Sequence, residues 1–271
     1  MDHSIVDTFS MNYSVISHLG EGGYGSVFLI EDNNNKQYAA KTILDSKVKS
    51  KTWSETRSEY VPNEVALWEG LTHDNLLSLL DVYHEEGKWI LVMEYNAGYV
   101  DLYDYVAEHG VMEAEEAACL VKQLLDVVYY LILAGVDHRD IKDENILYNP
   151  STKQIKLIDF GSASRLSSEP HTHFKGTEVY LPVEYFTKGY YHALPATVWA
   201  IGCLTYILLN GERPFRDTEE IRKSSLLWVE HVEGVERDFI IQCLAVEDRM
   251  GLSSMLYHPF LCQYAGDEVL L

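Results

Sequence analysis

His138–Asn145 reads His-Arg-Asp-Ile-Lys-Asp-Glu-Asn, and this octet is the strongest signal in the 271-residue chain. The carboxylate of Asp140 can accept the proton of an attacking hydroxyl and orient that hydroxyl. Lys142 can neutralise charge on a phosphoryl group, and Asn145 offers an amide oxygen to a magnesium ion. Chance does not readily produce this set of residue types at this spacing, so the octet indicates phosphoryl-transfer chemistry.

A second acidic motif, Asp159-Phe160-Gly161, follows Asn145 by 159 − 145 = 14 residues. It comes directly after the strand-like run Ile155–Ile158. An aspartate at the end of a strand, released by a glycine, suits a carboxylate that binds Mg²⁺. The motif is weak alone, but at this distance from the octet it is specific.

Gly20–Val27 reads Gly-Glu-Gly-Gly-Tyr-Gly-Ser-Val and matches G-x-G-x-x-G-x-V. Glycine lets the backbone approach phosphate oxygens, although glycines also form ordinary hairpin turns. A strand follows, not a helix, which argues against a dinucleotide-binding turn, and the absence of G-x-x-x-x-G-K-[ST] excludes a P-loop. Lys41 ends an apolar strand 41 − 25 = 16 residues after Gly25, where it could reach phosphates, and Glu64 is its candidate partner. A lysine on the surface of a strand is the alternative for Lys41.

Taken together, these motifs resemble those of eukaryotic protein kinases over nearly the whole chain. The resemblance implies an α+β fold of two lobes, a β-rich N-lobe at residues 1–95 and a helical C-lobe at residues 96–271. The two lobes would form one catalytic domain at about residues 13–261. Strands are expected at Tyr13–Leu19, Gly25–Glu31, Gln37–Leu44 and Trp89–Glu94, and helices at Glu64–Leu71, Glu113–Ala134, Ala196–Asn210 and Val235–Leu244.

The resemblance also implies the cofactors ATP and Mg²⁺ and a role for each motif. A lysine two residues after the base, here Lys142, is similar to the pattern of serine/threonine kinases. The implied reaction therefore moves the γ-phosphate of ATP to a serine or threonine of a protein. The catalytic residues would be Asp140 as the base, Lys142, and the ion pair of Lys41 with Glu64, and the metal ligands would be Asn145 and Asp159. The nucleotide would contact Leu19, Gly20, Gly22, Gly25, Val27, Ala39, Lys41, Met93, Glu94, Asn96, Leu147 and Ile158.

A narrower resemblance is to the Pim kinases, carried by Val61–Val65, His138–Leu147, Leu157–Ser162, Gly176-Thr177 with Val179-Tyr180, and Val198-Trp199. The run Glu94–Asp101 is as long as the Pim hinge, in which a proline removes a hydrogen-bond donor to adenine. Asn96 stands at the matching position, so a more ordinary adenine contact is expected here. Two departures are from the general kinase pattern. The Leu-Pro-Val-Glu run that ends at Glu184 replaces Ala-Pro-Glu, and Glu184 should pair with Arg249. Thr197 replaces an aspartate that braces the catalytic loop in most kinases and that Pim kinases also lack.

Four further residues are candidates for substrate binding: Asp101, Asp104, Glu144 and Thr177. The three acids match positions at which Pim kinases read basic peptides, and the net charge of −21 also favours cationic partners. Substrates with Arg or Lys before the acceptor are therefore expected, with a solvated acidic face as the alternative. Arg139 could bind a phosphate on the segment between Asp159 and Glu184, but the Pim resemblance implies activity without one. His171 and His173 are interpreted as bystanders and not as metal ligands.

The remaining expectations concern partners and location. The negative charge disfavours nucleic acid and anionic membranes, and the longest apolar run, Val198–Leu209, is expected to be a buried helix. Four separated cysteines predict reduced, buried thiols in a reducing compartment. We expect a monomer in the cytoplasm, with the nucleus as a second location.

Two alternatives remain for the function. A pseudokinase would use the same fold to bind nucleotide or partners without transfer, but it usually lacks one of the key polar residues that are all present here. A small-molecule kinase of related fold is disfavoured by the stretch from Gly176 to Glu184, which resembles a protein-substrate site.

Overall fold

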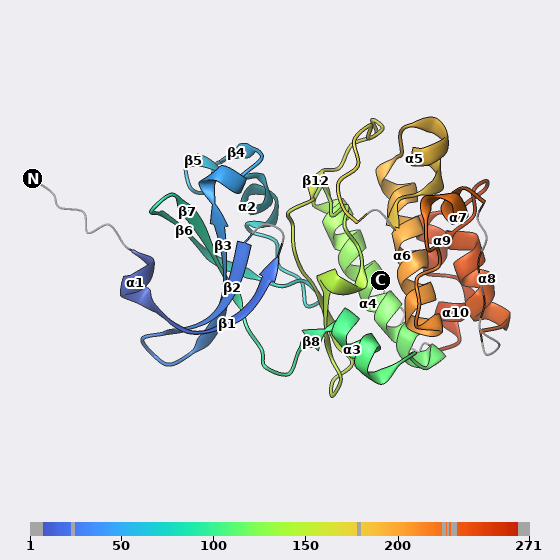
Figure 1. Cartoon of the computed structure of the whole chain (residues 1–271), viewed down its shortest axis with the longest axis horizontal. Coiled ribbons are helices and arrows are strands. Elements are labelled where there is room, and N and C mark those ends of the chain that lie inside the picture. Colours follow the sequence, from blue (N-terminus) through green and yellow to red (C-terminus); the bar gives the residue numbers. More distant parts are fainter. Residues whose placement is uncertain are drawn as a thin grey trace, which may run out of the picture. The chain divides into compact units, whose positions relative to one another are not determined.

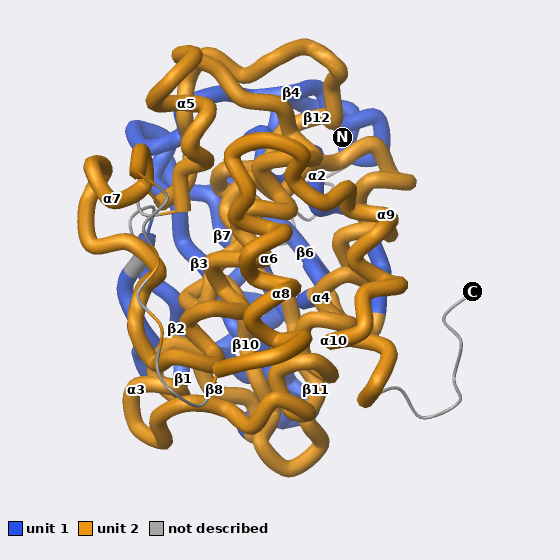
Figure 2. The backbone as a smooth tube through the Cα atoms, turned by 90° about the vertical axis from the view of Figure 1, so that its right-hand side faces the viewer, with its two compact units in different colours: residues 1–73, 77–97 blue, residues 74–76, 98–271 orange. Residues whose placement is uncertain are grey.

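The computed structural model describes residues 8–22, 25–177, 180–223, 226, 228 and 232–264. The chain divides into two units, residues 1–73 with 77–97 and residues 74–76 with 98–271 (Figure 2). The first unit is built on an antiparallel sheet and the second mainly on helices (Figure 1). The predicted α+β class, with a β-rich and a helical lobe, is confirmed.

The elements of the first unit are α1 (Phe9–Asn12), β1 (Tyr13–Gly22), β2 (Gly25–Asp32), β3 (Gln37–Leu44), the 3-10 turn η1 (Asp45–Lys47), β4 (Lys51–Ser54), β5 (Glu59–Pro62), α2 (Asn63–Trp68), β6 (Leu79–Glu85) and β7 (Lys88–Glu94). Five strands form one sheet in the order β1-β2-β3-β7-β6, and β4 pairs with β5 in a separate hairpin. The sequence did not predict that hairpin, because its strands are only four residues long and mostly exposed.

One face of the large sheet carries an aromatic-lined core cluster of the first unit. Ile30, Ala40, Ile90 and Val92 are buried there, and they pack against partly buried aromatic rings: Phe9, Tyr13, Phe28, Tyr38 and Tyr83. Because side chains alternate along a strand, the residues between these positions lie on the opposite face.

The elements of the second unit are β8 (Val100–Asp101), α3 (Leu102–His109), α4 (Ala114–Leu133), β9 (Val136–Asp137), the 3-10 turn η2 (Asp143–Asn145), β10 (Ile146–Asn149), β11 (Gln154–Leu157), β12 (Ser164–Arg165), α5 (Val183–Lys188), α6 (Ala193–Asn210), α7 (Thr218–Lys223), α8 (Gly234–Cys243), α9 (Leu252–Met255) and α10 (Pro259–Cys262). The long helices α4 and α6 pack together, α8 packs on α6, and α10 packs on α4 and α8 (Figure 1).

Helix α6 is the buried helix expected from the apolar run. It begins at Ala193, three residues before the predicted start at Ala196. Pro195 falls in the first turn, where backbone N–H groups have no partner within the helix, so the proline costs no hydrogen bond there. By length and composition α6 could cross a membrane, but 78% of it is buried inside the protein, as in the core helix of a globular domain.

The cysteines differ in part from the expectation of buried thiols. Cys203 and Cys243 are buried, Cys119 is half-buried and Cys262 is exposed, and all four are free. Cys262 is exposed because it ends α10, which is only four residues long.

Candidate active site

Four of the predicted nucleotide-binding residues in the first unit share one face of its sheet. Val27 lies opposite Lys41 on the neighbouring strand, and Ala39 lies opposite Met93. Directly opposed residues point to the same side, and Ala39 and Lys41 are two residues apart on β3. The face with Val27, Ala39, Lys41 and Met93 is therefore the one turned away from the aromatic core.

Lys41 meets its predicted partner. Its Nζ lies 3.0 Å from Oε2 of Glu64, which sits in the first turn of α2. The two side chains are only 13% and 9% exposed, so the pair is held in an environment with little water. This contact fixes the lysine on the sheet face that carries the other candidate residues.

The described glycines of the glycine-rich motif lie in the paired strands β1 and β2. Gly20 lies opposite Val27, and Gly22 lies opposite Gly25. A Cβ on Gly25 would lie 1.6 Å from the Thr42 carbonyl oxygen, so no larger residue fits there. Gly23 and Tyr24, which complete the motif, lie outside the described residues.

Three other candidates lie near the ends of strands in the first unit. Leu19 is on β1, Glu94 ends β7, and Asn96 follows in the next segment. The Glu94 carboxylate accepts a hydrogen bond of 2.9 Å from the N–H of Ser78. The adenine contact of Asn96 stays a prediction.

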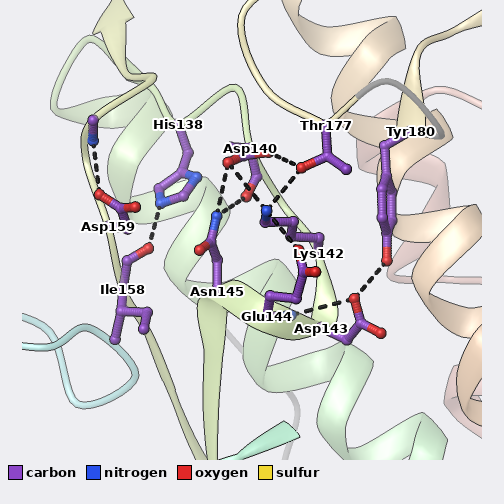
Figure 3. Close-up of polar contacts among 11 residues, drawn as sticks. His138, Asp140, Lys142, Asp143, Glu144, Asn145, Ile158, Asp159, Thr177 and Tyr180 are labelled. Atoms are coloured by element: carbon purple, nitrogen blue, oxygen red, sulfur yellow. Dashed lines mark hydrogen bonds and ion pairs between the residues drawn. The ribbon is translucent and has the colours of Figure 1, made fainter. Parts of the chain in front are cut away.

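The catalytic loop, residues 138–145, lies in the second unit and gathers four candidate side chains (Figure 3). Asn145 Nδ2 donates to the Asp140 carbonyl oxygen at 2.8 Å and to Asp140 Oδ2 at 3.0 Å. The hydroxyl of Thr177 donates to Asp140 Oδ1 at 3.3 Å and accepts from Lys142 Nζ at 2.7 Å. The Asp140 carboxylate is therefore oriented through both of its oxygens.

The two predicted metal ligands are placed side by side by the backbone. The N–H of Ile158 donates to the Asn145 carbonyl oxygen at 3.0 Å, and Asp159 is the next residue. Asp159 has φ +65°, and its Oδ1 accepts from the Gly161 N–H at 3.1 Å. Leu147, on β10, and Ile158 are the nucleotide candidates of this unit.

This donor set fits Mg²⁺. One carboxylate and one amide oxygen are hard ligands, and Mg²⁺ commonly takes one or two carboxylates together with substrate phosphates and water. Among the described residues, no group of three or more His, Cys, Asp and Glu side chains could hold a metal by itself.

His138 supports the catalytic loop through buried contacts with Ile158 and Phe160. Its side chain is buried, its Nε2 lies 3.0 Å from the Ile158 carbonyl oxygen, and its ring packs against Phe160. Burial lowers the pKa of His138, although Asp140 and Asp159 oppose that shift. The imidazole is therefore neutral at pH 7 and acts as a support for Ile158, next to Asp159.

Lys142 lies among acids. Its Nζ is 2.6 Å from Glu144 Oε2 and 3.8 Å from Asp140 Oδ2. Burial acts against its charge, but the hydrogen bond that Lys142 donates to Glu144 and the charges of Asp140, Glu144 and Asp159 raise its pKa overall. Lys142 is therefore a fixed positive charge beside the proposed base.

The sequence analysis assigned no role to Asp143, which lies inside the octet. Its buried carboxylate accepts a hydrogen bond of 2.9 Å from the Tyr180 hydroxyl (Figure 3). Burial raises the pKa of Asp143, while the Tyr180 hydrogen bond lowers it. No sequence signal connects these two residues, which are 37 positions apart.

The candidate substrate acids lie on neighbouring elements, because β8 and α3 both pack against η2. Asp101 caps α3: its carboxylate accepts from the N–H groups of Tyr103 and Asp104 at 2.8 and 3.4 Å. Burial raises the pKa of Asp101 to about 6, with the charges of Asp104 and Asp143 adding to the shift. Asp104 is exposed in the first turn of α3, and the Glu144 side chain is 39% exposed.

Arg139 contacts two residues outside the catalytic loop. Its Nη2 donates to the Tyr191 hydroxyl at 2.7 Å and to the His173 carbonyl oxygen at 3.1 Å. That His171 and His173 are not metal ligands stays a prediction, but His171 has a structural role: its backbone pairs with that of Tyr191, and its Nε2 lies 3.6 Å from Asp137 Oδ2. Antiparallel pairing over so short a stretch leaves no sequence pattern, so the sequence did not indicate this contact.

The two departures beyond residue 180 have different outcomes. The expected contact of Glu184 with Arg249 is present, with two parallel hydrogen bonds of 2.8 and 2.7 Å. Thr197 donates to the Ala193 carbonyl oxygen in its own helix, and among the described residues it makes no hydrogen bond to the catalytic loop. A cavity of about 30 Å³, enough for a water molecule, lies beside Thr197, Arg139 and Asp140.

Comparison with known proteins gives one family match, to the model described as "Protein kinase domain", over residues 13–261. Serine/threonine-protein kinase pim-2 of Danio rerio is 34% identical over 274 residues, which cover 96% of this chain and 88% of that protein. Serine/threonine-protein kinase prk-2 of Caenorhabditis elegans is 33% identical over 94% of this chain, and the match spans 59% of prk-2. The PAS domain-containing serine/threonine-protein kinase of Mus musculus is 34% identical over 78% of this chain but only 16% of its own length.

Proposed function

This chain belongs to the protein kinase family and is a serine/threonine kinase of the Pim type, and we propose that it actively transfers the γ-phosphate of ATP to serine or threonine hydroxyls of proteins. The observation that carries the proposal is the orientation of Asp140 by Asn145 and Thr177, with Lys142 beside it. A scaffold that only binds nucleotide has no need for a carboxylate held by both oxygens.

Each predicted catalytic or metal-binding residue has a task in the proposed reaction. Asp140 orients the substrate hydroxyl and accepts its proton, and Lys142 stabilises negative charge that develops on the transferred group. Lys41, held by Glu64, positions the α- and β-phosphates. Asn145 and Asp159 would hold Mg²⁺, which when bound neutralises phosphate charge. Catalysis then depends on positioning and on charge, without a covalent intermediate on the protein.

Transfer is tested with radiolabelled ATP, Mg²⁺ and a panel of basic and neutral serine peptides. The wild-type protein should label a basic peptide, and Asp140→Asn should reduce the rate by about 10²- to 10⁴-fold, the usual contribution of a general base. The variant should still bind nucleotide. Nucleotide binding by the wild-type protein without any transfer would favour the scaffold instead.

The second part of the proposal is a preference for basic residues before the acceptor. Asp101, Asp104 and Glu144 support it, because they lie on neighbouring elements beside the catalytic loop. The net charge of −21 supports it too, and it also supports the proposal that nucleic acid and anionic membranes are not partners.

The test for this preference must keep the helix cap. Asp101→Asn retains an N-cap oxygen for α3, whereas alanine would remove it and destabilise the helix. Asp101→Asn combined with Glu144→Gln should lower kcat/KM for basic peptides and leave neutral peptides unchanged. The matched control, Glu55→Gln with Glu59→Gln, removes two exposed charges from the other unit. An equal loss on both peptide classes would contradict the preference.

The third part is activity without a phosphate on residues 159–184. The contacts of Arg139 with Tyr191 and His173 support it, since they take up Nη2 of the guanidinium that would bind such a phosphate, although its buried Nε has no hydrogen-bond partner among the described residues. Treatment with a phosphatase, followed by its removal, should leave kcat unchanged. Loss of activity after this treatment would refute this part alone.

A further inference from the structure

We propose that Tyr191 is a positioning residue for phosphoryl transfer, which fixes Arg139 and the 171–177 segment beside Asp140 without the help of a phosphate. This inference rests on the proposed function, because it concerns the rate of the same reaction. Tyr191 lies in the loop between α5 and α6, far in sequence from the catalytic loop.

The hydroxyl of Tyr191 is the first part of the anchor. It accepts the 2.7 Å hydrogen bond from Arg139 Nη2, and the guanidinium lies 6.0 Å from the centre of the tyrosine ring. Tyr191 is only 3% exposed. A hydrogen bond from a charged donor is strong where water is excluded, so this contact restrains the guanidinium.

The backbone of Tyr191 is the second part. Its N–H donates to the His171 carbonyl oxygen at 3.1 Å, and the His171 N–H donates back to the Tyr191 carbonyl oxygen at 2.8 Å. The His171 side chain lies over the tyrosine ring at 5.3 Å and places its Nε2 3.6 Å from Oδ2 of Asp137. Tyr191 thus joins the 171–173 segment to the strand that leads into the catalytic loop.

The third part of the anchor is the close approach of Gly176 to Arg139 and Asp140. Gly176 has φ +118°, and a Cβ there would lie 2.8 Å from the Arg139 carbonyl oxygen and 3.1 Å from Asp140 Oδ1. The next residue, Thr177, donates to that same carboxylate. A shift of Arg139 would therefore change the contact between Asp140 and Thr177.

The backbone of Arg139 needs such restraint. Its φ of +65° is unfavourable for a residue with a side chain, and such a conformation persists only where surrounding contacts hold it. The hydrogen bonds to Tyr191 and His173 supply those contacts on the side-chain end.

Tyr191→Phe tests the hydroxyl alone, because the ring stays packed between Phe174, Tyr185 and His171. We expect kcat to fall about 10-fold, the effect of losing a hydrogen bond to a charged group, while KM for ATP stays within about 2-fold. The amides of residues 171–177 should exchange faster with solvent, and those of α4 should not. Tyr190→Phe is the matched control, since Tyr190 is 39% exposed and should keep wild-type values.

A double-mutant cycle with Arg139→Met separates positioning from a general structural role. If Tyr191 acts through Arg139, the loss caused by Tyr191→Phe should largely disappear in the Arg139→Met background. Additive losses would overturn the proposal, and so would wild-type kcat in Tyr191→Phe. If the wild-type protein transferred no phosphate, the proposed function would fail. The anchoring role of Tyr191 would then be tested by amide exchange alone: unchanged exchange of residues 171–177 in Tyr191→Phe would overturn it.

Discussion

Two charged clusters of the second unit use similar side chains for different ends. In the first, Glu184 and Arg249 form two parallel hydrogen bonds, and Arg249 also contacts the Pro195 and Ala245 carbonyl oxygens and the Trp199 ring. In the second, Lys142 Nζ lies within 3.8 Å of carboxylate oxygens of both Asp140 and Glu144, and the negative charge of Asp159 also helps to raise the pKa of Lys142. One cluster is balanced, while the other holds more negative charge than its lysine offsets.

This difference separates stability from activity. A balanced, bidentate pair loses its structure when one partner is removed, because the other is left buried and charged. A cluster with excess negative charge is incomplete without an added cation, which here would be Mg²⁺ and a basic substrate. Substitutions in the two clusters should therefore affect different measurements.

The largest expected effect is that of Asp159→Asn. Losing a metal ligand should reduce the rate of transfer by roughly 10³-fold, since a bound metal contributes several kcal/mol to the transition state. The free energy of unfolding without nucleotide should not fall, because the substitution removes a negative charge from an acidic cluster. Thermal unfolding with and without Mg-ADP checks this: nucleotide should stabilise the wild-type protein more than the variant. A wild-type rate of transfer in Asp159→Asn would show that the acidic cluster around Lys142 does not need a metal for activity, and would contradict the contrast with the Glu184–Arg249 pair.

Arg249→Met should show the opposite pattern. It leaves Glu184, whose side chain is only 15% exposed, without its cation, which should cost about 3 kcal/mol of unfolding free energy and lower Tm by on the order of 10 °C. The kcat of the molecules that remain folded should match the wild-type value. Denaturant unfolding and nucleotide titration of active sites measure the two quantities, with Arg222→Met, on the surface helix α7, as the control. A stable but inactive Arg249→Met would show that this pair takes part in catalysis.

Thr177→Val should have a smaller effect, confined to the catalytic cluster. Valine keeps the shape but removes the hydroxyl that bridges Lys142 and Asp140, so kcat should fall about 10-fold. Thr172→Val is the control, because that hydroxyl is exposed and contacts only His173 among the described residues. Peptide phosphorylation at saturating ATP measures both variants. Equal rates for the two would mean that the bridge does not orient Asp140.

The smallest effect concerns pH. Since the pKa of Asp101 is raised to about 6, its carboxyl is charged at pH 7.5 and mostly neutral at pH 5.5. The ratio of kcat/KM for a basic over a neutral peptide should therefore fall by about 2- to 5-fold between these values, the scale of one partly exposed ion pair. The arginines of the peptide stay charged throughout. In Asp101→Asn the ratio should not vary with pH, and a pH dependence that persists in this variant would assign it to another group.

The predictions from sequence succeeded where a motif was local. The octet, Asp159-Phe160-Gly161 and the strand of Lys41 each carry their chemistry within a few residues, and the structure shows Lys41 beside Glu64 and Asn145 beside Asp140. The helices α4 and α8 and the strand β3 lie within a residue of their expected bounds. The hairpin β4–β5 was missed, since it is short and has little buried surface.

By itself, the sequence determined the family, the fold class and the chemical type of the site, because those depend on residue kinds at fixed spacing. Only the tertiary structure decided which distant residues contact the catalytic loop and the strand before it. Tyr180 contacts Asp143, Tyr191 contacts Arg139, and His171 lies beside Asp137. These contacts join positions 34 to 52 residues apart. No periodicity encodes them, because they arise only when packed helices and strands bring separate segments within hydrogen-bonding distance.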